Sequence, residues 1–272
     1  MKKSLSCATL AMLLFTTACS KPDVSATLET ARQKAQVGTH EAWEEAYTSL
    51  DEIHSKYGVD KEATGAANFY AFYLQSMVKT NRDEKALDYA QQLADTFPDN
   101  FMLQYMTGKI HFDDNRMVLA TTYLERAIMV KENDPSAMTL LLQSAAQSEN
   151  PKTDSFFEQA ATLPEFSNDY CFYNEWGIYL NQKGANTPSR AQQISLHIKA
   201  IRKFTTALQR PDAVPAIYKN IAITYDKHIR NPKLAREFYK KYLFKLGSQP
   251  NSNLEARIEV QNRMRELAIL MR

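Results

Sequence analysis

The chain has 272 residues, a formal net charge of +2 and 44% hydrophobic residues. This apolar content is enough to build a core, so the composition excludes an intrinsically disordered chain. Only 7 glycines and 10 prolines interrupt long stretches of residues that favour helices. We therefore predict an all-α protein.

The first residues have the three parts of a secretion signal. Two lysines precede an apolar stretch over residues 5–15, and small residues follow up to Cys19. The apolar stretch is shorter than the roughly 20 residues of a membrane-spanning helix. We expect residues 1–18 to be removed as a signal peptide.

The residues before Cys19 resemble the lipobox of bacterial lipoproteins, although Thr16 stands where the usual leucine would be. The resemblance implies several acyl chains (palmitate among them) on Cys19, and two or more chains anchor a protein stably. In the Gram-negative lipoproteins that the chain resembles, a residue other than Asp at the place of Ser20 implies the periplasmic side of the outer membrane. Residues 19–26 form the expected tether. The alternative is an ordinary secretory peptide followed by a coincidental cysteine.

The remaining cysteines predict no disulfide framework. Cys7 leaves with the signal and Cys19 takes lipid, so Cys171 has no partner within the chain. We expect Cys171 to be a small, buried, apolar side chain on a helix, and the alternative is a reactive thiol.

Charge is distributed unequally along the expected mature chain. Residues 19–135 carry 12 basic and 19 acidic side chains, whereas residues 136–272 carry 19 basic and 12 acidic ones. The basic half is suited to an acidic partner or to anionic lipid headgroups. The alternative is that these charges are solvated helix faces.

A pattern of small and large apolar residues repeats every 34 residues. In residues 101–134, Gly108, Ala120, Leu124 and Ala127 fall at places 8, 20, 24 and 27. Residues 67–100 give the preceding copy, and residues 27–60 and 135–168 give weaker ones. Downstream copies are carried by Trp176, Gly177, Ala200, Phe204 and Ala207, and then by Tyr218, Ala222, Ala235 and Tyr239.

This pattern resembles the tetratricopeptide repeat (TPR). The resemblance implies a right-handed solenoid of helix hairpins, with about five to six repeats over residues 27–250 and a capping helix over residues 251–272. The helices marked by Trp176 and Ala200 stand further apart than the pattern requires. Residues 184–199 are therefore an insertion, either a long loop or an extension of the second helix.

In TPR proteins, places 2, 5, 6, 9, 12 and 13 of each first helix face a concave groove, which often holds an extended peptide or a partner helix. Lys219 and Asn220 resemble part of a carboxylate clamp, but the other clamp positions do not match. The expected partner-binding residues are Phe72, Gln75, Lys79, Tyr105, Met106, Lys109, Phe112, Asn174, Asn181, Lys219, Asn220 and Lys227.

The sequence contains no pattern that indicates catalysis. The five histidines include no pair at the spacing of a zinc helix, and no glycine-rich phosphate loop or nucleophile elbow is present. His111 stands where the repeat usually has Tyr, so we expect it to pack. We predict no catalytic residue, no metal and no cofactor. The alternative is an enzyme whose site lies in residues 184–199.

These observations predict a membrane-anchored periplasmic scaffold for protein–protein interactions, with protein partners in its groove, a bilayer contact through acylated Cys19 and no nucleic acid. By architecture it resembles lipoproteins that assemble envelope machines such as pili or secretion systems. The alternative is an adaptor that recruits cell-wall hydrolases or proteases.

Overall fold

The computed structural model describes residues 23–63, 65–247 and 254–271. The expected signal peptide and Cys19 lie outside these residues. Within them the chain forms fourteen α-helices and one short π-helix, with no strand. None of the helices in this part of the chain is both long and apolar enough to cross a bilayer. The prediction of an all-α fold is confirmed.

The chain forms two compact units that divide between Ile110 and His111. Asp23 caps the first helix by accepting a hydrogen bond from the amide of Ser25 at 2.9 Å, so this helix includes the last residues of the expected tether. The helices of the first unit are α1 (Val24–Ala35), α2 (His40–Tyr57), α3 (Ala66–Lys79), α4 (Asp83–Thr96) and most of α5 (Phe101–Asp113).

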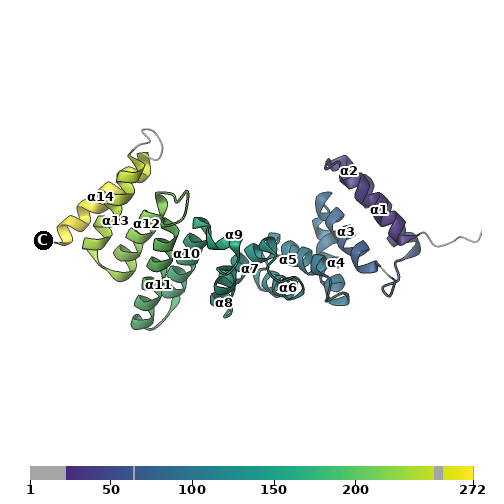
Figure 1. Ribbon diagram of the computed structural model, residues 1–272, viewed down its shortest axis with the longest axis horizontal. Helices are drawn as coiled ribbons and strands as arrows, with labels where there is room; N and C mark the ends of the chain where they lie inside the picture. Colours follow the sequence, from purple (N-terminus) through teal and green to yellow (C-terminus); the bar gives the residue numbers. More distant parts are fainter. Residues whose placement is uncertain (1–22, 64, 248–253, 272) are drawn as a thin grey trace, which may run out of the picture. The chain divides into compact units, whose positions relative to one another are not determined.

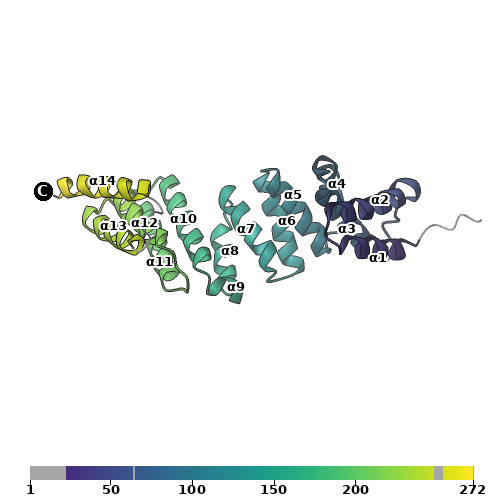
Figure 2. The ribbon, with the colours of Figure 1, turned by 90° about the horizontal axis from the view of Figure 1, so that it is seen from above.

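The second unit begins in the last turn of α5. Its consecutive helices form antiparallel hairpins, and α12, α13 and α14 lie side by side in both views (Figures 1 and 2). Its helices are α6 (Met117–Val130), α7 (Pro135–Gln147), α8 (Thr153–Ala160), α9 (Pro164–Ser167), α10 (Tyr170–Asn186), α11 (Arg190–Leu208), α12 (Ala216–Ile223), the π-helix η1 (Thr224–Ile229), α13 (Pro232–Leu246) and α14 (Leu254–Leu270).

The turns inside three successive hairpins repeat the same backbone geometry. Asn81, Asn115 and Glu149 are spaced by the repeat length and all have positive φ, at 58°, 60° and 52°. After each of them, the next amide donates to the carbonyl five residues earlier, at 2.8–2.9 Å. This is the left-handed cap that satisfies the last carbonyls of a helix. The backbone therefore follows the repeat that the sequence predicts.

Small residues allow the two helices of each hairpin to approach closely. A Cβ added to Gly177 of α10 would lie 2.5 Å from the ring of Phe204 on α11. Such a contact is far inside van der Waals distance, so any larger residue there would have to displace the ring. The alanines at the repeat's small places, Ala86, Ala120, Ala127, Ala200 and Ala207, are all 0% exposed.

The expected insertion is helical. Residues 184–186 complete α10 and residues 190–199 begin α11, so only residues 187–189 connect the two helices. The extra residues lengthen both helices of one hairpin, and the interpretation as a long loop is wrong. Gly184 makes the longer contact possible, because its added Cβ would lie 2.7 Å from the His197 ring.

Candidate functional site

A groove of about 350 Å³ lies between α7 and α10, which are first helices of neighbouring hairpins in the second unit. Its apolar floor is formed by side chains from α7, α8, α9 and α10. The floor residues are Leu142, Phe157, Phe166, Phe172 and Tyr179. The rim residues are Thr139, Gln143, Ala146 and Gln147 of α7, Asp169 at the start of α10, and Cys171, Glu175, Ile178 and Gln182 of α10.

The floor is held in place by contacts between aromatic rings. The centroid of the Phe157 ring lies 5.4 Å from that of Trp176 and 5.3 Å from that of Tyr179. Behind this stack, the ammonium of Lys203 lies 3.1 Å from the Trp176 ring centroid. Burial lowers the pKa of Lys203, against the opposing effect of nearby Glu158. Packed rings leave the floor few alternative rotamers, so it is preorganised for an apolar ligand.

The rim supplies polar amides. Gln143, Gln147 and Gln182 are exposed, and each amide offers donors and an acceptor that match those of a peptide backbone. The only charged side chains on this groove are the acidic Asp169 and Glu175. The groove therefore favours an uncharged or basic segment over one that ends in a carboxylate.

Cys171 corrects one of our predictions, because the structure places it on the surface. It is the second residue of α10, and that place of a first helix faces the groove. Its apolar side chain therefore lines the rim instead of the core.

The rim residues that the sequence analysis missed follow the same repeat register. Thr139, Gln143, Ala146 and Gln147 occupy places 5, 9, 12 and 13 of the copy that starts at residue 135. That copy matches the repeat weakly, and the sequence analysis predicts no groove residues in it. Applying the register to it would have identified this side of the groove.

The three predicted asparagines come together between α10 and the consecutive helices α12 and η1. The amide of Asn220 donates to Asn174 Oδ1 at 2.8 Å, and that of Asn181 donates to Thr224 Oγ1 at 2.7 Å. Asn181 and Asn220 also line a small hollow of about 190 Å³. Their amides bind to the protein itself, so they brace the two helices across this hollow.

The predicted lysines are not brought together. Lys219 Nζ lies 2.9 Å from Glu259 of α14, whereas Lys227 is exposed on η1. Asp226, at place 12 of the same repeat, is bound by Arg263 of α14. The capping helix α14 therefore binds the groove residues at the end where we expected Lys219 to contact a partner.

The first unit has a hollow of its own, about 490 Å³ in volume. The predicted residues Phe72 and Gln75 line it, and the Phe72 ring lies 5.5 Å from that of Trp43. Lys79, at the end of α3, is exposed and is not part of the lining. The other lining residues are Arg32, Ala35, Gln36, Asn68, Ala71 and Met102.

The candidates on α5 have mixed positions. Met106 is only 6% exposed and packs in the core of the first unit, which makes it a structural residue instead of a groove residue. Tyr105 is half-buried and stacks on Phe101, with ring centroids 5.8 Å apart. Lys109 and Phe112 are half-buried. Most residues of α5 are buried, so few of its side chains remain available to a groove.

No group of three or more His, Cys, Asp or Glu side chains within the described ranges is placed to hold a metal ion. His111 is 1% exposed and stacks on Tyr123, with ring centroids 5.7 Å apart. Burial, together with the positive charge of Arg116, lowers its pKa. The neutral ring packs, as the repeat register predicts.

Solved structures share this arrangement of helices. MamA aligns with a TM-score of 0.56 at 16% identity, covering 70% of this chain and 97% of MamA. YrrB, a TPR protein with an unusual peptide-binding site, aligns with a TM-score of 0.56 at 17% identity, covering 79% of this chain and 97% of YrrB. A further MamA structure, from MSR-1, aligns at 0.51 and 17% identity, covering 69% of this chain and all of MamA.

No protein-family model matches the sequence, and neither does any curated protein. At these identities the structural likeness concerns the fold alone. Together with the repeated turns and the small residues inside each hairpin, it shows that this chain has the fold of a TPR solenoid.

Proposed function

We propose that the protein is a scaffold that holds a segment of a partner protein in the groove between α7 and α10. The observation that carries this proposal is the groove itself, where a packed aromatic floor lies below a rim of exposed amides. This combination suits an extended segment, because the floor receives apolar side chains and the amides bind the backbone. The fold supports a binding role, and we assign no catalytic one.

The chemistry of the partner segment follows from the lining. Phe166, Phe172 and Ile178 offer apolar contacts, and Asp169 and Glu175 disfavour a negatively charged ligand. We propose an apolar segment with uncharged or basic flanks. This differs from the lysine-lined groove that the sequence suggests, since Lys219 is paired with Glu259.

We further propose that the scaffold is anchored to a membrane through Cys19 in the periplasm and serves the assembly of an envelope machine such as a pilus or a secretion system. The support is the sequence of the first residues, in which lysines, an apolar stretch and small residues lead to Cys19. A fractionation experiment tests the anchor. Cys19→Ala should release the protein from membranes, and unchanged membrane retention would refute the anchor.

Photo-crosslinking tests the groove. A crosslinking amino acid placed at Gln182, on the rim, should capture a partner in intact cells. The same amino acid at Gln91, an exposed residue of α4, is the matched control. Adding Ile178→Arg to the Gln182 variant should abolish capture. Binding of an apolar segment would then bury the arginine cation, which is unfavourable. The proposal fails if Gln91 captures the same partner, or if Ile178→Arg leaves the capture at Gln182 unchanged.

A further inference from the structure

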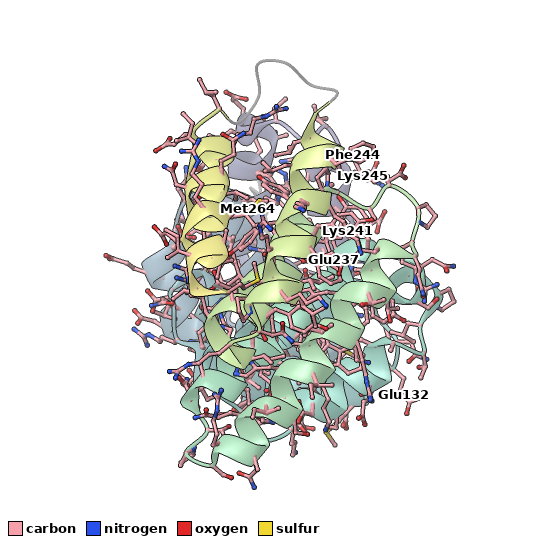
Figure 3. The ribbon with its side chains drawn as sticks, turned by 90° about the vertical axis from the view of Figure 1, so that its left-hand side faces the viewer. Glu132, Glu237, Lys241, Phe244, Lys245 and Met264 are labelled. Atoms are coloured by element: carbon pink, nitrogen blue, oxygen red, sulfur yellow. The ribbon has the colours of Figure 1, made fainter. Side chains whose placement is uncertain are left out.

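Helix α13 carries an exposed aromatic residue among lysines. The side chain of Phe244 is 80% exposed, although phenylalanine is usually buried. Lys240, Lys241 and Lys245 are exposed around it, and Figure 3 shows Lys241, Phe244 and Lys245 on the outer side of the helix. We call these four residues the α13 basic patch.

The patch belongs to one continuous face of the helix. Lys233, Glu237, Lys240 and Phe244 recur at spacings of three and four residues, so they form one stripe. The opposite face is buried through Ala235, Tyr239, Tyr242 and Leu246. The stripe therefore lies on the surface of the protein, and substitutions within it leave the core intact.

Of the three lysines in the patch, Lys241 alone forms an ion pair among the described residues. Glu237 pairs with Lys241 at 2.7 Å and is the one acidic residue of α13. The second helix of the preceding hairpin, α11, adds exposed Lys199 and Arg202 beside Ile198, which is 42% exposed. The last two hairpins thus present basic side chains together with apolar ones.

This character is not a general property of second helices in the repeat. The exposed residues of α4, which is also a second helix, include Asp83, Glu84, Asp88 and Asp95. The same structural position is therefore acidic in one hairpin and basic in another. Repeat architecture alone does not explain the α13 basic patch.

Further apolar side chains lie at the same end of the last hairpin. A guanidinium nitrogen of Arg257 donates to the carbonyl of Leu246 at 2.5 Å, so the start of α14 lies beside the end of α13. There Leu254 is 69% exposed and Ile258 is 49% exposed. This end of the last hairpin therefore exposes apolar and basic side chains, together with the acidic Glu255.

We propose that the α13 basic patch docks on a bilayer surface that contains anionic phospholipids. Lysines place their ammonium groups among phosphates while their stems cover apolar surface. A protruding phenylalanine inserts at the headgroup boundary and requires no matching pocket. The positive charge of the lysines favours anionic lipid. The protruding ring favours a bilayer over an acidic protein, because a bilayer deforms to accept the ring, whereas the surface of a protein is fixed. The docking is independent of the groove between α7 and α10 and of acylation at Cys19.

Vesicle co-sedimentation tests the proposal with residues 20–272, which retain every described residue but lack Cys19. The chain should bind vesicles with about 30% phosphatidylglycerol and not vesicles of phosphatidylcholine alone, and high salt should release it. Lys240→Gln/Lys241→Gln/Lys245→Gln should weaken binding about 100-fold, at about five-fold for each charge. Phe244→Ser should weaken it without changing the salt dependence.

The matched control is Lys56→Gln/Lys61→Gln/Lys79→Gln, which removes three exposed charges from the first unit. It should bind the anionic vesicles as the unmodified chain does. Equal loss in the control and α13 variants would overturn the proposal, as would equal binding to neutral vesicles. Binding of soluble polyglutamate through the patch without vesicle binding would also overturn it, since the occupant would then be an acidic protein.

Discussion

Arg263 of α14 binds Asp226 of η1 through two hydrogen bonds, from Nε to Oδ2 at 2.8 Å and from Nη2 to Oδ1 at 2.7 Å. The Asp226 side chain is 1% exposed. Burial alone would raise its pKa, but the hydrogen bonds and the charge of Arg263 lower it. Tyr239 adds a third hydrogen bond at 3.2 Å. This pair joins the capping helix to the last hairpin.

Arg263→Gln should detach α14, because it leaves the Asp226 carboxylate buried without its charge partner. We expect a loss of about 3 kcal/mol. Hydrogen exchange over residues 254–271 measures this locally, which avoids assuming two-state unfolding in a repeat protein. Arg265→Gln removes an exposed charge from the same helix and should change protection little. Equal protection of α14 in the Arg263 variant and the unmodified chain would contradict the role of the pair.

Acidification should destabilise the second unit through its stacked histidines, His197 and His228, whose ring centroids lie 4.3 Å apart. Burial, with the nearby charges of His228 and Arg190, lowers the pKa of His197 to about 4 from 6.5. Above pH 6.5 both the folded and the unfolded states are neutral at this residue. Between pH 6.5 and 4 the unfolded state takes up the proton first, so stability falls by about 3 kcal/mol.

Urea denaturation at several pH values measures this loss. His197→Gln should flatten the fall in unfolding midpoint between pH 6.5 and 4, because no proton is then taken up at this residue on unfolding. Glutamine retains a polar group beside Asn181, whose Oδ1 lies 3.0 Å from Nδ1 of His197. If the variant and the unmodified chain have the same pH slope, His197 is not the group responsible.

Gly177→Ala should destabilise the α10–α11 hairpin by about 1–3 kcal/mol, since the added methyl group meets the ring of Phe204 at 2.5 Å. Thermal unfolding followed by circular dichroism measures the loss. Phe204→Leu should restore part of the stability in the alanine variant, although it is destabilising by itself. Additive losses in the double variant would show that the two residues do not compete for the same space.

The thiol of Cys171 should react with a soluble thiol reagent in the folded protein, because it is exposed on the groove rim. In residues 20–272 it is the only cysteine, so labelling is specific. We expect complete labelling without denaturant. A bound partner segment should slow the reaction, because it covers the rim. Labelling that requires unfolding would restore the prediction of a buried side chain.

The sequence by itself determined the class of fold and the register of the repeats. Gly108, Ala120 and Ala127 mark where helices must touch, and a requirement for small side chains is visible in sequence because larger ones cannot fit. The same register places Phe72 and Gln75 on a hollow, as predicted. Local steric rules of this kind depend only on neighbours within a hairpin.

Tertiary structure alone decided which groove positions are available to a partner. Lys219 occupies a groove place in the register, but Glu259 reaches it from a helix about forty residues further along the chain. Met106 also occupies a groove place and is buried by its neighbours, whereas Cys171 is exposed where burial was expected. Burial and ion pairing depend on which distant helices pack together, and the pattern within a single repeat carries no information about that.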